Sequence, residues 1–599
     1  MPLPKIALQA EPAAAPARRA AVGPGMAGAL GSAWRHAACA LGGACCMLAS
    51  GWPGADGAMP LAAITPVGPT AGALAGLAAA ASAGLATVVA ATNAWVLQAL
   101  GLALFLLALA GRPVRQAMAL ALVFGLVWQT GTIAWLHIGM HKYAGLPAPW
   151  SVAAVAALGL YLASYTALAT GLWAWLVRRR GLGPVRSALL FGATWLLADL
   201  GRTVLFTGFP WAHGGYAHLH GPMRPLVPWL GVDGVSALAA CLVAAAVLIW
   251  HAPGRLPRKL LTTIAGAGLL GWLAQLPDPE FTRPAGEFDA LLLQSNVSQE
   301  GKFEGERVGQ AMAWHARALE RSFADLTLTP ETAIPVLEHE LPEAWRARLL
   351  QRAQARSGVL LIGLPRAVQP HGQVNALIGL GQAVSMPGFG ADRPYRYEKA
   401  HLVPFAEFTP PGFAWFTRRL DLPMPAFQRG QAAPEPMPLR TRAGMLQRIA
   451  PLVCFEDLFS LELARRFARA DTAPTVLANA SNLAWFDDSA AIAQHLRMAQ
   501  FRSLEFQRPT LRATNTGTTA LIDHHGQVVR ALPPHTRDTL GVVVEGRQGL
   551  TPYARWAAQA GHLPLLLAAL AVSGLCLLGR PAHARSRMAL ATRAARRGG

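Results

Sequence analysis

The chain has 599 residues, of which 53% are hydrophobic and only 14% are charged, and its formal net charge is +20. Soluble globular proteins have about 25% charged residues, so this composition excludes one large water-soluble enzyme and also a disordered chain. The charge does not indicate a nucleic-acid partner, because the region 287–545 is nearly neutral and the surplus Lys and Arg fall in short clusters between apolar runs. Membrane proteins mark their cytoplasmic loops in this way.

Apolar runs long enough to cross a membrane need ~20 residues. The sequence predicts eight such spans, near 71–91, 93–111, 116–137, 150–177, 187–206, 225–250, 258–276 and 560–579. If the basic loops are cytoplasmic, the spans alternate in direction and both termini lie in the cytoplasm, including a basic tail at 580–599. The predicted fold is a multi-pass α-helical membrane domain, with one large domain on the opposite side of the membrane.

Residues 1–70 are predicted to be an N-terminal extension, partly disordered because its first part is rich in Ala, Pro and Arg. Within it, 37–52 is apolar but short, and it follows several arginines. A cleaved signal peptide is one interpretation and a ninth span is another, although a ninth span breaks the alternation. We favour a non-spanning or interfacial segment.

The region 287–548 has a different pattern, in which short apolar runs alternate with helical stretches. Strands are expected near 290–293, 359–364, 376–379, 449–453, 475–478, 519–522 and 540–544, and helices near 307–326, 342–356, 458–470 and 490–506. Strands alternating with helices over this length predict a single α/β domain in which helices cover the sheet.

One cysteine stands out in this domain. Cys454 is its only cysteine, since the other five lie in apolar segments elsewhere, so it has no disulfide partner there. The spacing of Cys and His is not that of a metal site, and we expect neither metal nor cofactor. Two interpretations remain open at this point: a buried structural cysteine, or a nucleophile placed where a strand ends and a helix begins.

Three segments resemble the Glu–Lys–Cys triad of the nitrilase superfamily, in the same order: Pro330–Ala333, Glu398–Phe405 and Cys454–Glu456. The run Lys399–Phe408, together with the spans, resembles more specifically the apolipoprotein N-acyltransferase family. This resemblance covers about 71–579. It implies that 287–548 is a nitrilase-like (carbon-nitrogen hydrolase) αββα sandwich on the periplasmic side of a bacterial inner membrane.

The resemblance also implies the chemistry. Glu331 is the general base, Lys399 stabilises the oxyanion, and Cys454 receives an acyl chain as a thioester. The donor is a membrane phospholipid resembling phosphatidylethanolamine. The acceptor is the free amino group of the diacylglyceryl-cysteine of a diacylated apolipoprotein, and the kinetics are ping-pong.

Residues of a supporting set match the same family: Glu407, Glu456, Phe455, Asn479, Ser481, Asn482 and Trp485. The alternative for both glutamates is a structural salt bridge or hydrogen bond, and for Trp485 it is ordinary core packing. The sequence departs from the family pattern at Leu483, where an Asp is usual, and at Thr329, where a Trp is common. Phe455 itself replaces a frequent Tyr.

Other functions are compatible with parts of the pattern. A membrane-tethered amidase of the same superfamily would use the same triad with water as acceptor. A non-catalytic scaffold that binds lipoproteins would not need the intact triad. A proton-coupled transporter is disfavoured because no relay of acidic or histidine residues runs through the spans.

Overall fold

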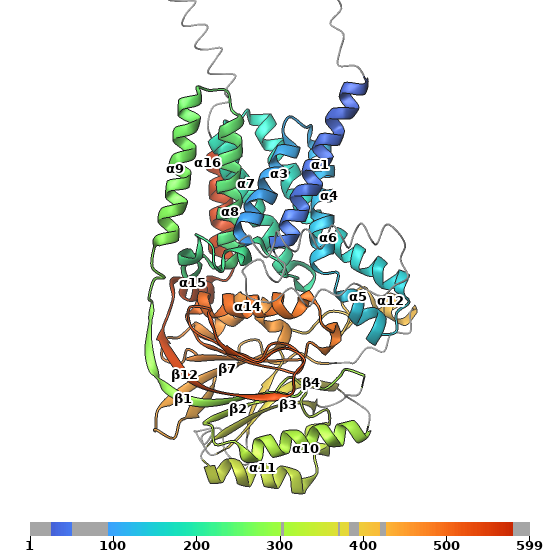
Figure 1. Ribbon diagram of the computed structural model, residues 1–599, viewed down its shortest axis with the longest axis vertical. Helices are drawn as coiled ribbons and strands as arrows, with labels where there is room; N and C mark the ends of the chain where they lie inside the picture. Colours follow the sequence, from blue (N-terminus) through green and yellow to red (C-terminus); the bar gives the residue numbers. More distant parts are fainter. Residues whose placement is uncertain are drawn as a thin grey trace, which may run out of the picture.

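The computed structural model describes residues 26–50, 94–300, 305–356, 358–368, 372–381, 394–419 and 427–578. A bundle of helices occupies one end of the molecule and two stacked sheets occupy the other (Figure 1). The expected span at 71–91 and the basic tail at 580–599 lie outside the described residues.

The bundle consists of long apolar helices that run alternately toward and away from the sheets (Figure 1). They are α1 (Met26–Ser50), α3 (Ala94–Leu109), α4 (Val114–Thr132), α6 (Ala148–Arg180), α7 (Pro184–Val204), α8 (Val227–His251), α9 (Leu256–Gln275) and α16 (Leu563–Leu577). Shorter elements connect them: α5 (Leu136–Ile138), η2 (Gly139–Tyr143), η3 (Leu205–Thr207), η4 (Gly214–His218), η5 (Arg224–Leu226) and α15 (Pro552–Ala560).

Several of these helices could cross a membrane. Among the described residues, three segments are long and apolar enough: Ala148–Arg180, Pro184–Thr207 and Arg224–His251. The number rises to 5 if each of two bent pairs is one span, namely Val114–Thr132 with Leu136–Tyr143 and Pro552–Ala560 with Leu563–Leu577.

The N-terminal apolar segment is longer than the short one expected at 37–52. Helix α1 has 25 residues and packs along α3 and α4. Glycines face each other where α1 meets α3, and a Cβ on Gly43 would lie 2.7 Å from the carbonyl oxygen of Gly101. Small residues allow helix backbones to approach closely in this way, so α1 is an integral member of the bundle.

The two sheets have six strands each. The first has the order β12–β1–β2–β3–β4–β5 and the second β11–β10–β9–β8–β7–β6. The strands are β1 (Thr282–Gln294), β2 (Leu326–Leu328), β3 (Val359–Val368), β4 (Gly372–Leu380), β5 (Tyr395–Glu398), β6 (Met437–Arg440), β7 (Leu446–Val453), β8 (Val476–Ser481), β9 (Thr510–Thr514), β10 (Ala520–Ile522), β11 (Val528–Ala531) and β12 (Asp538–Gly549). All seven predicted strands lie within this set, whereas β2, β5, β6, β9 and β11 were not predicted.

Helices cover both outer faces of the stacked sheets. Helices α10 (Gly305–Arg321) and α11 (Glu343–Arg356) lie on the first sheet, and α14 (Ala490–Phe506) lies between the second sheet and the bundle (Figure 1). Strand β3 shows why its sequence is continuously apolar: Val359 and Leu361 face the core between the sheets, whereas Leu360 and Ile362 pack under α10 and α11. The domain is therefore an αββα sandwich.

The remaining short helices lie on the connections of this domain. They are η6 (Glu338–Glu340), α12 (Ala414–Arg419), η8 (Cys454–Leu458), α13 (Ser460–Ala464), η9 (Arg465–Phe467) and η10 (Ala484–Phe486). The helix expected at 307–326 ends at Arg321, because Leu326–Leu328 pairs as β2 between β1 and β3.

Candidate active site

The three residues of the expected triad all follow the ends of strands. Glu331 comes three residues after β2, Lys399 comes directly after β5, and Cys454 comes directly after β7. Strands β2 and β5 belong to the first sheet and β7 to the second. The stacking of the two sheets thus brings segments that are remote in the sequence to one place.

A buried ammonium group lies between two carboxylates at this place. The Lys399 Nζ atom is 3.2 Å from Glu331 Oε1 and 2.9 Å from Glu407 Oε1. All three residues are buried. Burial alone would lower the pKa of Lys399, but the charges of Glu331 and Glu407 raise it above its ordinary value. The lysine is therefore a permanent cation in this site.

Asn375 connects the two carboxylates from the neighbouring strand β4. Its Nδ2 atom donates to Glu331 Oε1 at 2.7 Å and to Glu407 Oε1 at 3.3 Å. Its backbone carbonyl oxygen accepts from the backbone N–H of Lys399 at 2.8 Å. Asn375 was not predicted as a site residue. The available signal was a polar side chain at the start of the apolar run 376–379, in a buried strand.

Two backbone N–H groups complete the binding of the carboxylates. The Asn482 N–H donates to Glu331 Oε2 at 2.9 Å, and the Val403 N–H donates to Glu407 Oε2 at 2.7 Å. Each carboxylate is consequently held at both oxygens.

Cys454 has a strained backbone and a protonated thiol. Its φ angle of 51° lies in the left-handed region, which residues other than glycine rarely adopt. Burial and the charge of Glu331 raise the pKa of the thiol, although Lys399 and the Asn482 N–H lower it in part, and the net shift is upward. A neutral thiol is a weak nucleophile, so this site needs a base to activate it.

The carbonyl oxygen of Cys454 is fixed by two side chains. It accepts hydrogen bonds from Asn479 Nδ2 at 3.2 Å and from His495 Nε2 at 3.0 Å. His495 is itself bonded through Nδ1 to Arg512 at 2.6 Å, and Arg512 also lies 3.4 Å from the Asp457 carboxylate. Burial raises the pKa of Asp457 to about 6 although Arg512 opposes the shift. This buried network around the nucleophile was not predicted beyond Asn479.

Glu456 has a structural position. Its Oε1 atom accepts from the N–H groups of Ala400 and His401 at 2.7 and 3.1 Å. Its Oε2 atom accepts from Tyr397 at 2.5 Å and from the Val453 N–H at 2.7 Å. The side chain therefore joins the segment that carries the lysine to the segment that carries the cysteine, which is the hydrogen-bonded alternative considered above.

The other members of the supporting set lie around this centre. Ser481 donates a hydrogen bond to Asn479 Oδ1, and Asn482 contributes the N–H that binds Glu331. Phe455 packs against Phe459, with ring centroids 5.2 Å apart. Trp485 lies on Tyr143 of η2 in the bundle and is 40% exposed, so it belongs to the junction between the domains.

The other two departures from the family pattern, Thr329 and Leu483, are both buried. Thr329 accepts a hydrogen bond from the Gly363 N–H at 2.9 Å, which ties the loop that carries Glu331 to strand β3. Leu483 packs near Gly517 as a core residue.

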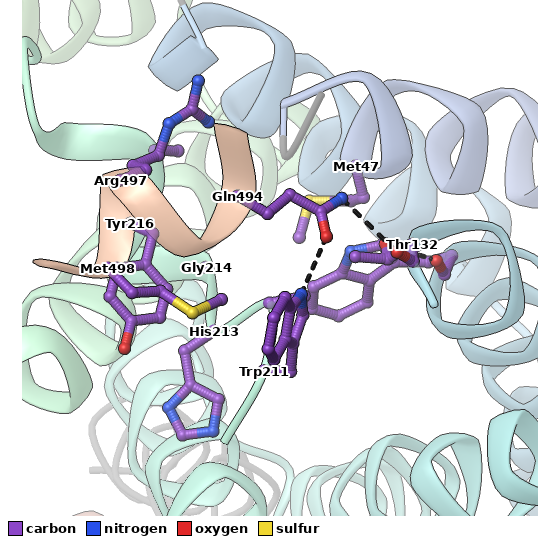
Figure 2. Close-up of a pocket in the computed structure, with 12 residues that line it drawn as sticks. Met47, Thr132, Trp211, His213, Gly214, Tyr216, Gln494, Arg497 and Met498 are labelled. Atoms are coloured by element: carbon purple, nitrogen blue, oxygen red, sulfur yellow. Dashed lines mark hydrogen bonds between the residues drawn. The ribbon is translucent and has the colours of Figure 1, made fainter. Parts of the chain in front are cut away.

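Helix α14 attaches the site to the bundle. Gln494 Oε1 accepts from the Trp211 indole N–H at 2.7 Å, and its Nε2 donates to the Thr132 carbonyl at 3.3 Å (Figure 2). The same Oε1 atom also accepts from the Trp135 indole N–H at 3.0 Å. A small cavity of ≈ 30 Å³ opens beside these residues. The Trp211 ring also stacks on His495, with centroids 6.0 Å apart. Most of the helix is buried because it lies between the sheet and the bundle.

The comparisons with known proteins cover both domains. A family model described as the apolipoprotein N-acyltransferase N-terminal domain matches residues 72–246, and one described as carbon-nitrogen hydrolase matches residues 299–547. An apolipoprotein N-acyltransferase of Verminephrobacter eiseniae (strain EF01-2) is 42% identical over 468 residues, which cover 75% of this chain and 84% of the relative. One from Ralstonia nicotianae is 41% identical over 485 residues, covering 80% and 89%. Among solved structures, a carbon-nitrogen hydrolase from Helicobacter pylori G27 is 13% identical, with a TM-score of 0.32, covering 44% of this chain and 90% of that one.

Proposed function

The chain belongs to the apolipoprotein N-acyltransferase family of the nitrilase superfamily, and on that premise we propose that Glu331, Lys399 and Cys454 perform its acyl transfer. The enzyme N-acylates lipoproteins, as its relatives are named to do. The observation that supports the proposed triad is the Lys399 ammonium shared by two buried carboxylates beside a protonated, strained cysteine.

In the first half-reaction, Glu331 takes the proton of the Cys454 thiol while the sulfur attacks the sn-1 ester carbonyl of a phospholipid. Lys399 stabilises the negative oxygen of the tetrahedral intermediate, together with a backbone N–H beside Cys454. The C–O bond then breaks, Glu331 returns the proton to the leaving alkoxide, and a lysophospholipid departs. The acyl chain remains on sulfur as a thioester.

In the second half-reaction, the α-amino group of a diacylglyceryl-cysteine attacks the thioester carbonyl. Glu331 accepts the proton from the nitrogen, the C–S bond breaks, and the thiol is restored as the proton returns to sulfur. A phosphatidylethanolamine-like donor and a diacylated apolipoprotein both remain anchored in the bilayer, because exposing an acyl chain to water costs ~0.8 kcal/mol per CH₂.

We also propose how the chain lies in a bacterial inner membrane. Among the described residues, eight helices are the spans: α1, α3, α4, α6, α7, α8, α9 and α16. Helix α1, whose segment 37–52 was expected not to span, is then the first, and 287–548 is the catalytic domain on the periplasmic side. Their alternating direction supports this count (Figure 1). The basic ends Arg112, Arg178–Arg180 and Arg255 all lie at helix ends away from the sheets, as expected for cytoplasmic loops. Both termini are then cytoplasmic.

The proposal is tested with a phospholipid that carries a radiolabelled sn-1 chain. The full-length enzyme in detergent should acquire a label that hydroxylamine removes, and a diacylated lipopeptide should then receive the label on its amino group. Cys454→Ala should remain unlabelled, whereas Cys576→Ala, at a cysteine of α16, should behave as the parent protein.

Two results would contradict the mechanism. Label retained by Cys454→Ala would exclude the thioester at this residue. Release of free fatty acid without N-acylated product would mean that water, not the lipoprotein amine, accepts the acyl group from the thioester, as in the hydrolytic alternative.

A further inference from the structure

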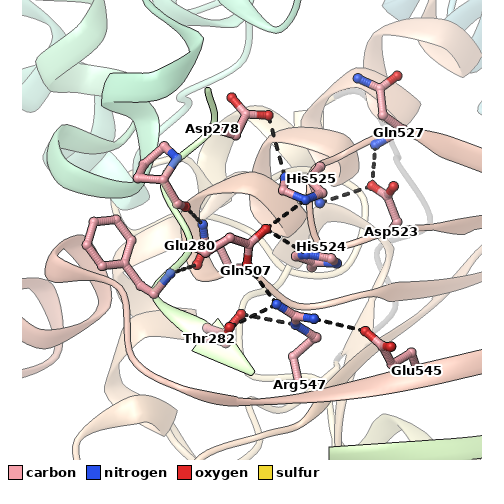
Figure 3. A network of polar contacts seen from close by, with 12 residues as sticks. Asp278, Glu280, Thr282, Gln507, Asp523, His524, His525, Gln527, Glu545 and Arg547 are labelled. Atoms are coloured by element: carbon pink, nitrogen blue, oxygen red, sulfur yellow. Dashed lines mark hydrogen bonds and ion pairs between the residues drawn. The ribbon is translucent and has the colours of Figure 1, made fainter. Parts of the chain in front are cut away.

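A cluster of histidine and carboxylate side chains lies where the catalytic domain meets the helix bundle, on elements that do not carry the triad. Glu280 is in the segment between α9 and β1, whereas His524 and His525 are in the turn between β10 and β11 (Figure 3). Asp278 of the same segment lies beside them and binds Arg224 of η5 at 2.8 Å. The cluster therefore joins the bundle, the interdomain segment and one hairpin.

Three ligand atoms converge in this cluster. Glu280 Oε1 is 2.9 Å from His525 Nε2 and 3.3 Å from His524 Nε2, and all three atoms lie within 4.8 Å of one another. Bonds of about 2.0–2.2 Å from nitrogen and oxygen to a tetrahedral zinc ion would place the ligand atoms at comparable separations. Among the described residues, this is the only group of three His, Cys, Asp or Glu side chains that converges in this way.

Neighbouring side chains hold these three residues in the way that groups behind the ligands of a metal site orient those ligands. The other ring nitrogen of His525 faces Asp278 Oδ2 at 3.5 Å, and a carboxylate behind a ligand histidine is a frequent feature of zinc sites. The second oxygen of Glu280 is held by Arg547 at 2.7 Å. Asp523 shapes the turn by accepting from the N–H groups of His525 at 3.0 Å and Gln527 at 2.7 Å.

The charge of the cluster favours a cation. Four carboxylates lie in the network, those of Asp278, Glu280, Asp523 and Glu545, and the Arg547 guanidinium lies among them (Figure 3). A second guanidinium, that of Arg224, pairs with Asp278. With neutral imidazoles, the network has a surplus of two negative charges, which one divalent ion balances.

We propose that Glu280, His524 and His525 bind one divalent transition-metal ion, with zinc as the best fit to a ligand set of two imidazoles and one carboxylate. Water fills the fourth position. The ion fastens the interdomain segment to the β10–β11 hairpin and so stabilises the orientation of the catalytic domain on the bundle. This role is structural and independent of the acyl-transfer reaction.

The test uses the full-length enzyme in detergent, free of any histidine tag. The protein is stripped with EDTA, incubated with zinc chloride, desalted, and analysed for metal by mass spectrometry. We expect about one zinc per chain, and at least a tenfold loss of affinity in His524→Ala and in the nearly isosteric Glu280→Gln. His535→Ala alters a histidine of the same domain that lies beside Asp488, and it should retain the metal.

Two further measurements identify the location and the effect of the ion. Cobalt bound here should give a spectrum without a thiolate charge-transfer band, because no cysteine is a ligand. Zinc should raise the melting temperature of the parent protein and of His535→Ala but not of Glu280→Gln. Failure of the parent protein to retain zinc, equal retention by Glu280→Gln, or a thiolate band that places the metal at Cys454 would each overturn the proposal.

Discussion

Replacing Glu331 with Gln tests the proposed base while leaving most of the site in place. The Lys399 ammonium keeps Glu407 as a counter-ion at 2.9 Å, so the substitution does not leave a buried charge unpaired. The amide can direct its oxygen toward Lys399 and Asn375, but its NH₂ group then faces the Asn482 N–H, which now donates to Glu331 Oε2. One hydrogen bond is lost, at a cost of ~1–3 kcal/mol in stability.

The loss of catalysis should be larger than the loss of stability. General base catalysis contributes ~10²–10⁴-fold, equivalent to ~3–5 kcal/mol of barrier. Thioester formation on Cys454, followed in a single turnover with labelled phospholipid, should slow by that factor. Glu343→Gln, at an exposed residue of α11, is the matched control and should keep the parent rate.

The reactivity of the thiol toward a simple alkylating agent should change in the opposite direction. Because the Glu331 charge raises the pKa of Cys454, its removal lowers that pKa and increases the thiolate fraction at a fixed pH. Iodoacetamide should therefore modify Glu331→Gln faster than the parent protein. If acylation and alkylation both stay within a few-fold of the parent rates, Glu331 is not the base and the reasoning fails.

Three other substitutions or conditions probe the supports of the site. Glu456→Gln should lower the free energy of unfolding by ~2–5 kcal/mol, because an amide cannot accept from all four donors around it, and thermal melting measures the loss. Gln494→Leu should leave two buried indole N–H groups unpaired and lower kcat more than it changes KM, whereas Gln500→Leu on the same helix should leave kcat unaltered. The pKa of Asp457, raised from 3.8 to about 6, means that the folded state binds the extra proton, so its contribution to stability should fall as pH rises from about 4 to 6. Melting curves of Asp457→Asn should lack that dependence.

Local sequence signals were sufficient for the parts of the fold that repeat a simple pattern. Long apolar runs predicted the long helices α3, α4, α6, α7, α8, α9 and α16, and strand-length runs predicted seven of the twelve strands that the structure describes. The strands that were missed are short or polar. Strand β2 has only three residues and follows a helix closely, and the predicted helix 307–326 included its first residue, Leu326. It nevertheless pairs with β1 on one side and β3 on the other.

The triad segments could be identified in the sequence, but their supports could not. The position of Asn375 depends on the register of β4 against β5, which pairs Ala376 with Glu398 and so places Asn375 opposite Lys399. His495 reaches both the Cys454 carbonyl and Arg512 only because α14 lies across the second sheet. Such contacts depend on three-dimensional packing, and no local periodicity encodes them.

Helix α14 connects the helix bundle to the proposed nucleophile. Its residue His495 holds the carbonyl of the strained Cys454, and the preceding residue, Gln494, is bonded to two tryptophans of the bundle. A left-handed backbone conformation costs a residue such as Cys454 ~1–3 kcal/mol of strain. The residue keeps this conformation only while the surrounding contacts hold it in place. Because one of those surroundings is fixed by the bundle, the catalytic domain alone should not maintain the geometry of its nucleophile. The bundle therefore contributes directly to the shape of the active site, in addition to anchoring the enzyme beside its lipid substrates.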